Sequence, residues 1–182
     1  AAPAPPAAGR VFITNEQGGD ISVVDVAAQR VTATIPVGKR PRGIRFSPDG
    51  TEVFVAPTGL PIAPPGVDES TLPPPDKKSD GIGVVSVRDL KLLRVIQAGS
   101  DPEQTAITLD GTRLFVANED VGELSVVSVS DGKVLATFKV GGDLGHDSHQ
   151  PRGACLDIGC SVGLERNFGR HPPLVVQGTV PN

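Results

Sequence analysis

The sequence repeats itself, and this repetition restricts the fold more than any other feature does. The apolar segments VFITN, VFVAP and LFVAN begin at Val11, Val53 and Leu114. A second and a third apolar segment follow each of them, with a spacing of 42 residues between units and 19 extra residues inside the second unit. Short segments rich in Val, Ile, Phe and Thr and bounded by Gly, Pro, Asp or Asn are typical of β-strands. The sequence therefore predicts equivalent units of short antiparallel strands.

Four short strands in each period of roughly 40 residues are typical of a β-propeller blade. An inner strand begins at Pro41 and again at Pro102, and the SPDG segment at 47–50 predicts a type I turn after the first of them. Phe12, Phe54 and Phe115 share one register, which predicts a repeated core layer between sheets. The remaining predicted strands lie at 11–15, 20–26, 30–38, 53–57, 81–87, 91–99, 114–118, 123–129 and 133–141.

We therefore expect an all-β fold made of propeller blades of four antiparallel strands, with about three blades present. The sequence predicts three outer strands but only two clear inner ones. The first predicted strand is therefore the second strand of a blade. Three blades cannot close a ring, and the sheets at the two ends would leave apolar faces in water. These faces could be covered in three ways: the chain is part of a longer protein, it pairs with copies of itself, or it forms an open wedge whose end is capped by the tail.

The segments VFITN, VFVAP and LFVAN, the VVDV and VVSV strands and the SPDG turn resemble the bacterial YVTN-type propeller repeats over about residues 11–141. This resemblance implies a propeller, usually of about seven blades, in an extracytoplasmic or surface setting. The insert of the second unit is similar to that of propeller proteins that accompany pyrroloquinoline-quinone-dependent alcohol catabolism. Some relatives bind haem or hydrolyse lactones through their propellers.

Composition excludes some classes of function. The formal net charge is -4, and the chain has neither Trp nor Tyr and no basic run, which argues against nucleic acid as a partner. No window approaches 18 consecutive apolar residues, so we expect no membrane span. The chain contains no Met, and residues 1–10 are rich in Ala and Pro, which predicts a disordered segment left after processing. A periplasmic or secreted location is therefore expected.

The loops between second and third strands and the linkers between blades are expected on one rim, where propellers commonly bind. A Pro-rich insert at 58–80 adds a long loop to this rim, and loops of this length are usually functional or disordered. These loops carry clusters of polar and charged residues. Such clusters fit either a solvated loop surface or a binding surface for a partner protein or a small polar ligand. The candidate binding residues are Asn15, Glu16, Arg40, Arg42, Asp68, Glu69, Lys77, Lys78, Asp101, Glu103, Asn118 and Glu119.

The repeat stops after residue 141. Residues 142–182 form a divergent tail, which is either a displaced and degraded inner strand near Pro151 or the result of truncation or a frame shift. Cys155 and Cys160 could form a disulfide or remain free thiols. The pair His146 and His149 satisfies only half of a zinc pattern, so we predict no metal site.

No catalytic residue or cofactor is predicted. The chain has no GxSxG, no phosphate-binding glycine motif and no CxxCH for covalent haem. The sequence therefore favours a non-enzymatic, exported propeller module that binds a protein partner or a small polar ligand, or associates with itself. The alternative is a fragment of a propeller enzyme, either a lactonase-like hydrolase or a cofactor-bearing oxidoreductase subunit.

Overall fold

The computed structural model describes residues 9–140, which form eleven β-strands and two short 3-10 helices. The described residues contain no α-helix, and no helix among them is long and apolar enough to cross a membrane. The predicted all-β class is therefore confirmed. The elements are β1 (Arg10–Asn15), β2 (Asp20–Asp25), β3 (Arg30–Pro36), β4 (Pro41–Phe46), β5 (Glu52–Pro57), η1 (Glu69–Thr71), η2 (Lys77–Ser79), β6 (Ile82–Ser86), β7 (Lys91–Ile96), β8 (Pro102–Ile107), β9 (Arg113–Asn118), β10 (Glu123–Ser128) and β11 (Val134–Lys139).

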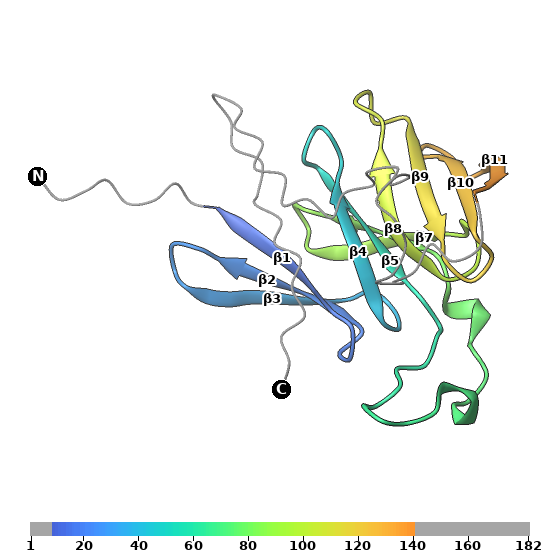
Figure 1. The fold of residues 1–182 in the computed structure, drawn as a ribbon. Helices are drawn as coiled ribbons and strands as arrows, with labels where there is room; N and C mark the ends of the chain where they lie inside the picture. The colour runs from blue at the N-terminus through green and yellow to red at the C-terminus, as the bar shows by residue number, and fades with distance from the viewer. Residues whose placement is uncertain (1–8, 141–182) are drawn as a thin grey trace, which may run out of the picture.

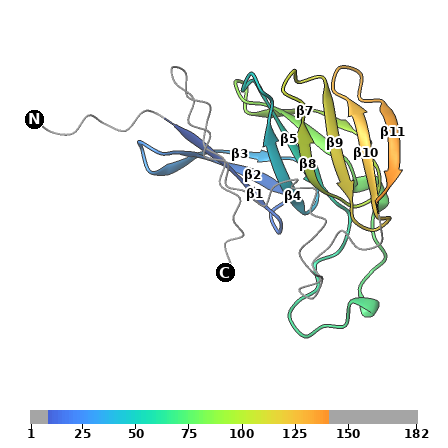
Figure 2. The same cartoon turned by 45° about the horizontal axis from the view of Figure 1, so that its top comes forward.

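The strands form three separate antiparallel sheets, which follow one another as the successive blades of an incomplete propeller (Figures 1 and 2). Blade 1 has the order β1-β2-β3, blade 2 has β4-β5-β6-β7 and blade 3 has β11-β10-β9-β8. The strands β4 and β8 are the inner strands of blades 2 and 3. Among the described residues blade 1 has no such strand, so β1 lies at the edge of its sheet.

The repeat of the sequence reappears as a repeat of strand register. Phe12 is paired with Val23 in blade 1, Phe54 with Val84 in blade 2, and Phe115 with Val126 in blade 3. In every blade the register between the third and outer strands shifts directly after this Val. Equivalent residues therefore occupy equivalent places in all three sheets.

The outer strands of blades 1 and 2 end earlier than the sequence predicts. β3 ends at Pro36 and β7 ends at Ile96, whereas the predicted strands extend to residues 38 and 99. The chain turns there because Gly38 and Gly99 have φ angles of 120° and 133°, a region that favours glycine. This turn brings each outer strand back to the inner strand of the next blade.

The blades pack through two apolar cores. The core between blades 1 and 2 includes Phe12 and Val53, and the core between blades 2 and 3 includes Phe54 and Leu114, all of them with no exposed surface. Phe115 is half-buried because it points away from blade 2. Burial of these apolar side chains is the main contribution to the stability of such a fold.

Candidate functional site

One rim of the three blades gathers the segments that the sequence identified as binding loops. We call it the insert rim; it carries the β1–β2 turn, the β3–β4 and β7–β8 linkers, the β9–β10 turn and the insert at 58–80, which hangs below the sheets as the teal-to-green loop of Figure 1. Lys39 of the first linker forms an ion pair with Asp76 of the insert at 2.6 Å. Lys77 of the insert pairs with Asp120 of blade 3. The insert thus contacts loops of both neighbouring blades.

The base of the insert is a buried polar network. Thr58 and Asp80, at its two ends, are 0% and 2% exposed. The Thr58 hydroxyl donates to Asp101 of the next linker at 2.6 Å, and the Gly59 N–H donates to Asp80 at 2.8 Å. Asp80 also accepts from the Asp101 N–H at 3.0 Å. Burial raises the pKa of Asp101, while the hydrogen bond from Thr58 opposes this rise.

A groove lies between the first part of the insert and the loops of blade 1. It has a volume of about 500 Å³. Glu16 accepts a hydrogen bond from Arg40 at 3.2 Å on one side of it. Leu60 and Ile62 of the insert supply an apolar wall, and Ile62 is 40% exposed. We call this the insert groove; its lining consists of Glu16, Gln17, Gly18, Gly19, Pro36, Gly38, Lys39, Arg40, Leu60 and Ile62.

Arg42, on the inner strand β4, is the centre of a charged cluster on the insert rim. Its guanidinium donates to Glu103 of β8 at 2.6 Å and to Glu119 of the β9–β10 turn at 2.7 Å. The pKa of Glu103 is raised to about 7, mainly by burial; the positive charge of Arg42 opposes this rise, and the hydrogen bond and charge of Glu119 contribute to it. Because Thr14 of blade 1 donates to the Arg42 carbonyl at 3.0 Å, this cluster connects all three blades.

The two predicted Asn residues lie at equivalent positions with different surroundings. Asn15 is half-buried, and its amide donates to Asp20 at 2.5 Å and to Ser22 at 2.9 Å. Asn118 has no exposed surface, and its amide donates to Ser125 at 2.8 Å and to the Ala98 carbonyl at 3.3 Å. Asn118 therefore stabilises the interior of the rim, as Asp101 does, and neither presents its side chain on the open surface.

The remaining predicted residues lie in the insert. The Asp68 carboxylate accepts from the Ser70 N–H at 2.9 Å, and this hydrogen bond lowers the pKa of the exposed Asp68. Glu69 begins η1, and Lys78 is exposed in η2. Neither Asp68 nor Lys78 lines the insert groove, whereas Glu16 and Arg40 do.

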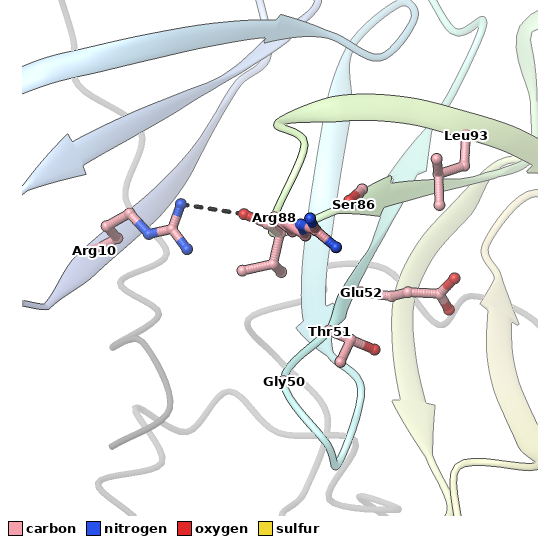
Figure 3. A pocket seen from close by; sticks show the side chains of 8 residues that line it. Arg10, Gly50, Thr51, Glu52, Ser86, Arg88 and Leu93 are labelled. Carbon is pink, nitrogen blue, oxygen red and sulfur yellow. Dashed lines mark hydrogen bonds between the residues drawn. The ribbon is translucent and has the colours of Figure 1, made fainter. Parts of the chain in front are cut away.

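A second cavity, of about 580 Å³, lies on the opposite rim, where the SPDG turn is located (Figure 3). Arg10 donates to the Val87 carbonyl at 3.1 Å and thereby joins blade 1 to blade 2. Arg88, Glu52 and other residues of blade 2 complete the lining. The sequence reasoning did not identify this cavity because it placed binding on the insert rim alone.

Several predictions fall beyond the part of the chain that the structure describes. These are residues 1–8 of the N-terminal segment predicted at 1–10, the possible disulfide between Cys155 and Cys160, the pair His146 and His149, and the origin of the tail at 142–182. Within residues 9–140, no group of three or more His, Cys, Asp or Glu side chains is arranged to hold a metal ion.

The sequence reasoning also missed four residues that shape the insert rim: Thr58, Leu60, Ile62 and Asp80. Thr58 directly follows β5 and Asp80 lies two residues before β6, so their places at the two ends of the insert are the signal that could have identified them as its anchors. Leu60 and Ile62 are aliphatic side chains in a Pro-rich loop, and only the path of the loop shows that they face the β1–β2 turn.

Comparison with known proteins supports the fold. No family model matches this chain, and no curated protein sequence matches it. Hydrazine synthase of Kuenenia stuttgartiensis has a similar structure, with a TM-score of 0.53 and 16% identity over 75% of this chain and 38% of that one. Dihydro-heme d1 dehydrogenase NirN, solved with its ligand DHE, matches with a TM-score of 0.52 and 18% identity over 74% of this chain and 24% of that one.

A candidate 6-phosphogluconolactonase of Bacteroides fragilis is a third similar structure. Its TM-score is 0.50, with 19% identity over 71% of this chain and 34% of that one. The present chain thus spans well under half of each of these proteins. At such low identity the likeness shows the fold alone, which is the β-propeller fold in an incomplete form.

Proposed function

We propose that this chain is a non-enzymatic binding module of the YVTN type, and that it engages its partner through the insert groove. The observation that supports this most directly is the position of the insert, whose first residues place an apolar wall opposite Glu16 and Arg40. Recognition sites are typically concave, with aliphatic side chains and a few charged or polar groups in their lining. Blades 1 and 2 hold the loops that form it.

The chemistry of the groove suits a segment of a partner protein. Its volume of about 500 Å³ accommodates only a few side chains. Leu60 and Ile62 would pack against an apolar side chain of that segment, while Lys39 and Arg40 would attract its carboxylates. A small polar ligand would use the same charged groups without needing Ile62, so the two kinds of ligand depend differently on this residue.

The proposed location is the periplasm or the exterior of the cell. There the chain would act as a binding module of a quinone-dependent oxidation system. The resemblance of the repeats and of the insert supports this setting. Fractionation of cells that produce the protein from its complete gene would test it. Recovery with the cytosolic fraction would contradict the proposal.

The binding proposal is tested with peptides selected by display on the wild-type chain. Ile62→Asp places a charge in the apolar wall, and Val67→Asp is its matched control, because Val67 is 42% exposed in the same insert but does not line the groove. Loss of one buried aliphatic contact costs about 1.5–3 kcal/mol, which corresponds to weaker binding by about tenfold or more. Equal affinities of the two variants would overturn the proposal.

One observation favours the alternative that the chain belongs to a propeller hydrolase. The Glu103 side chain is 24% exposed, and its pKa of about 7 suits a general acid or base at neutral pH. This reading predicts slow hydrolysis of a sugar lactone that Glu103→Gln abolishes. If the wild-type chain and Glu103→Gln show the same rate as buffer alone, the alternative is excluded for this chain.

A further inference from the structure

Blades 1 and 2 each have one apolar face that packs against the blade that follows. In blades 1 and 2 we call this the leading face. Its members in blade 1 are Phe12, Ile21, Val23, Ile35 and Val37, all at most 2% exposed. The equivalent residues of blade 2 are Phe54, Ile82, Val84, Ile96 and Ala98, all at most 3% exposed.

Blade 3 carries the same face without a described blade against it. The residues at the equivalent positions are again apolar, namely Phe115, Leu124, Val126, Phe138 and Val140. Phe138 is 53% exposed, whereas its equivalents Ile96 and Ile35 are 3% and 2% exposed. The outer part of this leading face is thus exposed to solvent, although its residues are apolar.

The opposite face, which we call the trailing face, packs against the preceding blade in blades 2 and 3. In blade 2 it consists of Val53, Val55, Val85 and Val87, which pack against the leading face of blade 1. The equivalent residues of blade 1 are Val11, Ile13, Val24 and Val26. Val26 is 40% exposed, while its equivalent Val87 is 7% exposed.

We propose that the leading face of blade 3 docks on the trailing face of blade 1 in a second copy of this chain, head to tail. Apart from the inner strand that blade 1 lacks among the described residues, both halves of this junction resemble an interface that the chain already contains twice, between blades 1 and 2 and between blades 2 and 3. In both internal junctions a leading face meets a trailing face. The contact between copies is therefore heterologous, and it forms a ring if the rotation closes and a chain of copies if it does not.

The proposal is independent of the insert groove, because none of the residues of the two end faces named here lines it. Phe138→Asp places a charge in the leading end face, and Val24→Asp places one in the trailing end face. Leu135→Asp is the matched control: Leu135 is 55% exposed on the same strand as Phe138, and its equivalent Leu93 stays 46% exposed although blade 2 has neighbours on both sides. Circular dichroism checks that each variant is folded, with Val140→Asp and Val26→Asp as replacements.

Light scattering after size exclusion, over a concentration series of the full chain, measures the association. We expect wild type and Leu135→Asp to have at least twice the mass of one 18.8 kDa chain, and each of Phe138→Asp and Val24→Asp to have the mass of a single chain. An equal mixture of these two variants should recover a dimer, because each supplies the face that the other has lost.

Other outcomes would overturn the proposal. A wild-type chain that remains monomeric across the series would show that something else covers the end faces. A Val24→Asp variant that still forms dimers, while Phe138→Asp does not, would show that leading faces pair with each other. Loss of association in Leu135→Asp would show that the contact uses the outer edge of blade 3 and not its face.

Discussion

Arg42 of β4 and Glu103 of β8 form an ion pair of 2.6 Å between the inner strands of blades 2 and 3. The two side chains are 17% and 24% exposed, and Glu119 adds a second carboxylate at 2.7 Å. Removal of the guanidinium would leave two half-buried carboxylates facing each other without a counter-charge. The pair therefore contributes to the junction of the blades as well as to the charge of the insert rim.

We expect Arg42→Met to lower the free energy of unfolding by about 2 kcal/mol, because loss of one partner leaves uncompensated charge in a partly buried site. Urea unfolding measures the change. Arg30→Met is the control, since Arg30 is exposed on β3, and we expect it to be close to wild type. A similar small effect for both variants would show that the cluster contributes little to stability.

The pKa of Glu103 predicts how stability depends on pH. Because its pKa is raised to about 7 in the folded chain and lies near 4.5 when the chain is unfolded, the folded state binds a proton more tightly. This contribution to stability is fully present below about pH 4.5 and is lost as the pH rises through 7. Urea midpoints measured between these values should therefore fall with rising pH, and Glu103→Gln should flatten the slope. A slope that the variant leaves unchanged would contradict the assignment.

The hairpins between third and outer strands predict a stabilising substitution. Gln29 and Leu90 adopt φ angles of 50° and 52°, and Gly132 has 70° at the equivalent position of blade 3. A residue with a side chain pays about 1–2 kcal/mol in this left-handed region. We therefore expect Gln29→Gly to raise the free energy of unfolding by about 1 kcal/mol and Gly132→Ala to lower it by a similar amount. Thermal unfolding tests the pair, and changes of equal sign would refute the explanation.

Gly43 of β4 marks the closest approach of the inner strands. A Cβ atom at this position would lie 2.4 Å from the Glu103 carbonyl oxygen of β8, which belongs to the backbone and cannot move easily. We expect Gly43→Ala to destabilise the chain by about 1–3 kcal/mol through strain at the junction of blades 2 and 3.

Gly83→Ala is the control for this substitution. A Cβ there would meet Val55 and Leu92 side-chain atoms at 3.0 and 3.2 Å, and these can shift by a small amount. Denaturant unfolding should therefore place Gly83→Ala between Gly43→Ala and wild type. The reverse order would mean that the inner strands approach each other less closely than described.

The fold was predictable from the sequence because its determinants are local and repeated. The apolar alternation around Phe12, Phe54 and Phe115 and the SPDG turn at 47–50 specify the strands and hairpins of each unit. The turn forms as expected, with a hydrogen bond from the Gly50 N–H to the Ser47 carbonyl at 2.9 Å. Repetition then supplies independent copies of the same signal.

The site was predictable only in part, because burial on the rim depends on residues distant in the sequence. Asn15 and Asn118 are equivalent in register, yet Asn118 is covered by the linker that contains Ala98 and Gly99. No local pattern distinguishes the two. The rim position of Glu16 and Arg40 could be derived from strand order, whereas the wall formed by Ile62 depends on the path of the insert across the rim.

The central claim is that the insert recognises the partner while the blades fold without its free portion. Deletion of residues 61–74 tests it most directly, since this deletion keeps the anchors Thr58, Gly59, Asp76 and Asp80. We measure the unfolding midpoint and the affinity for a display-selected peptide on the same sample. The account predicts a midpoint close to wild type and a loss of affinity of about tenfold or more. Unchanged affinity in a folded deletion variant would contradict it.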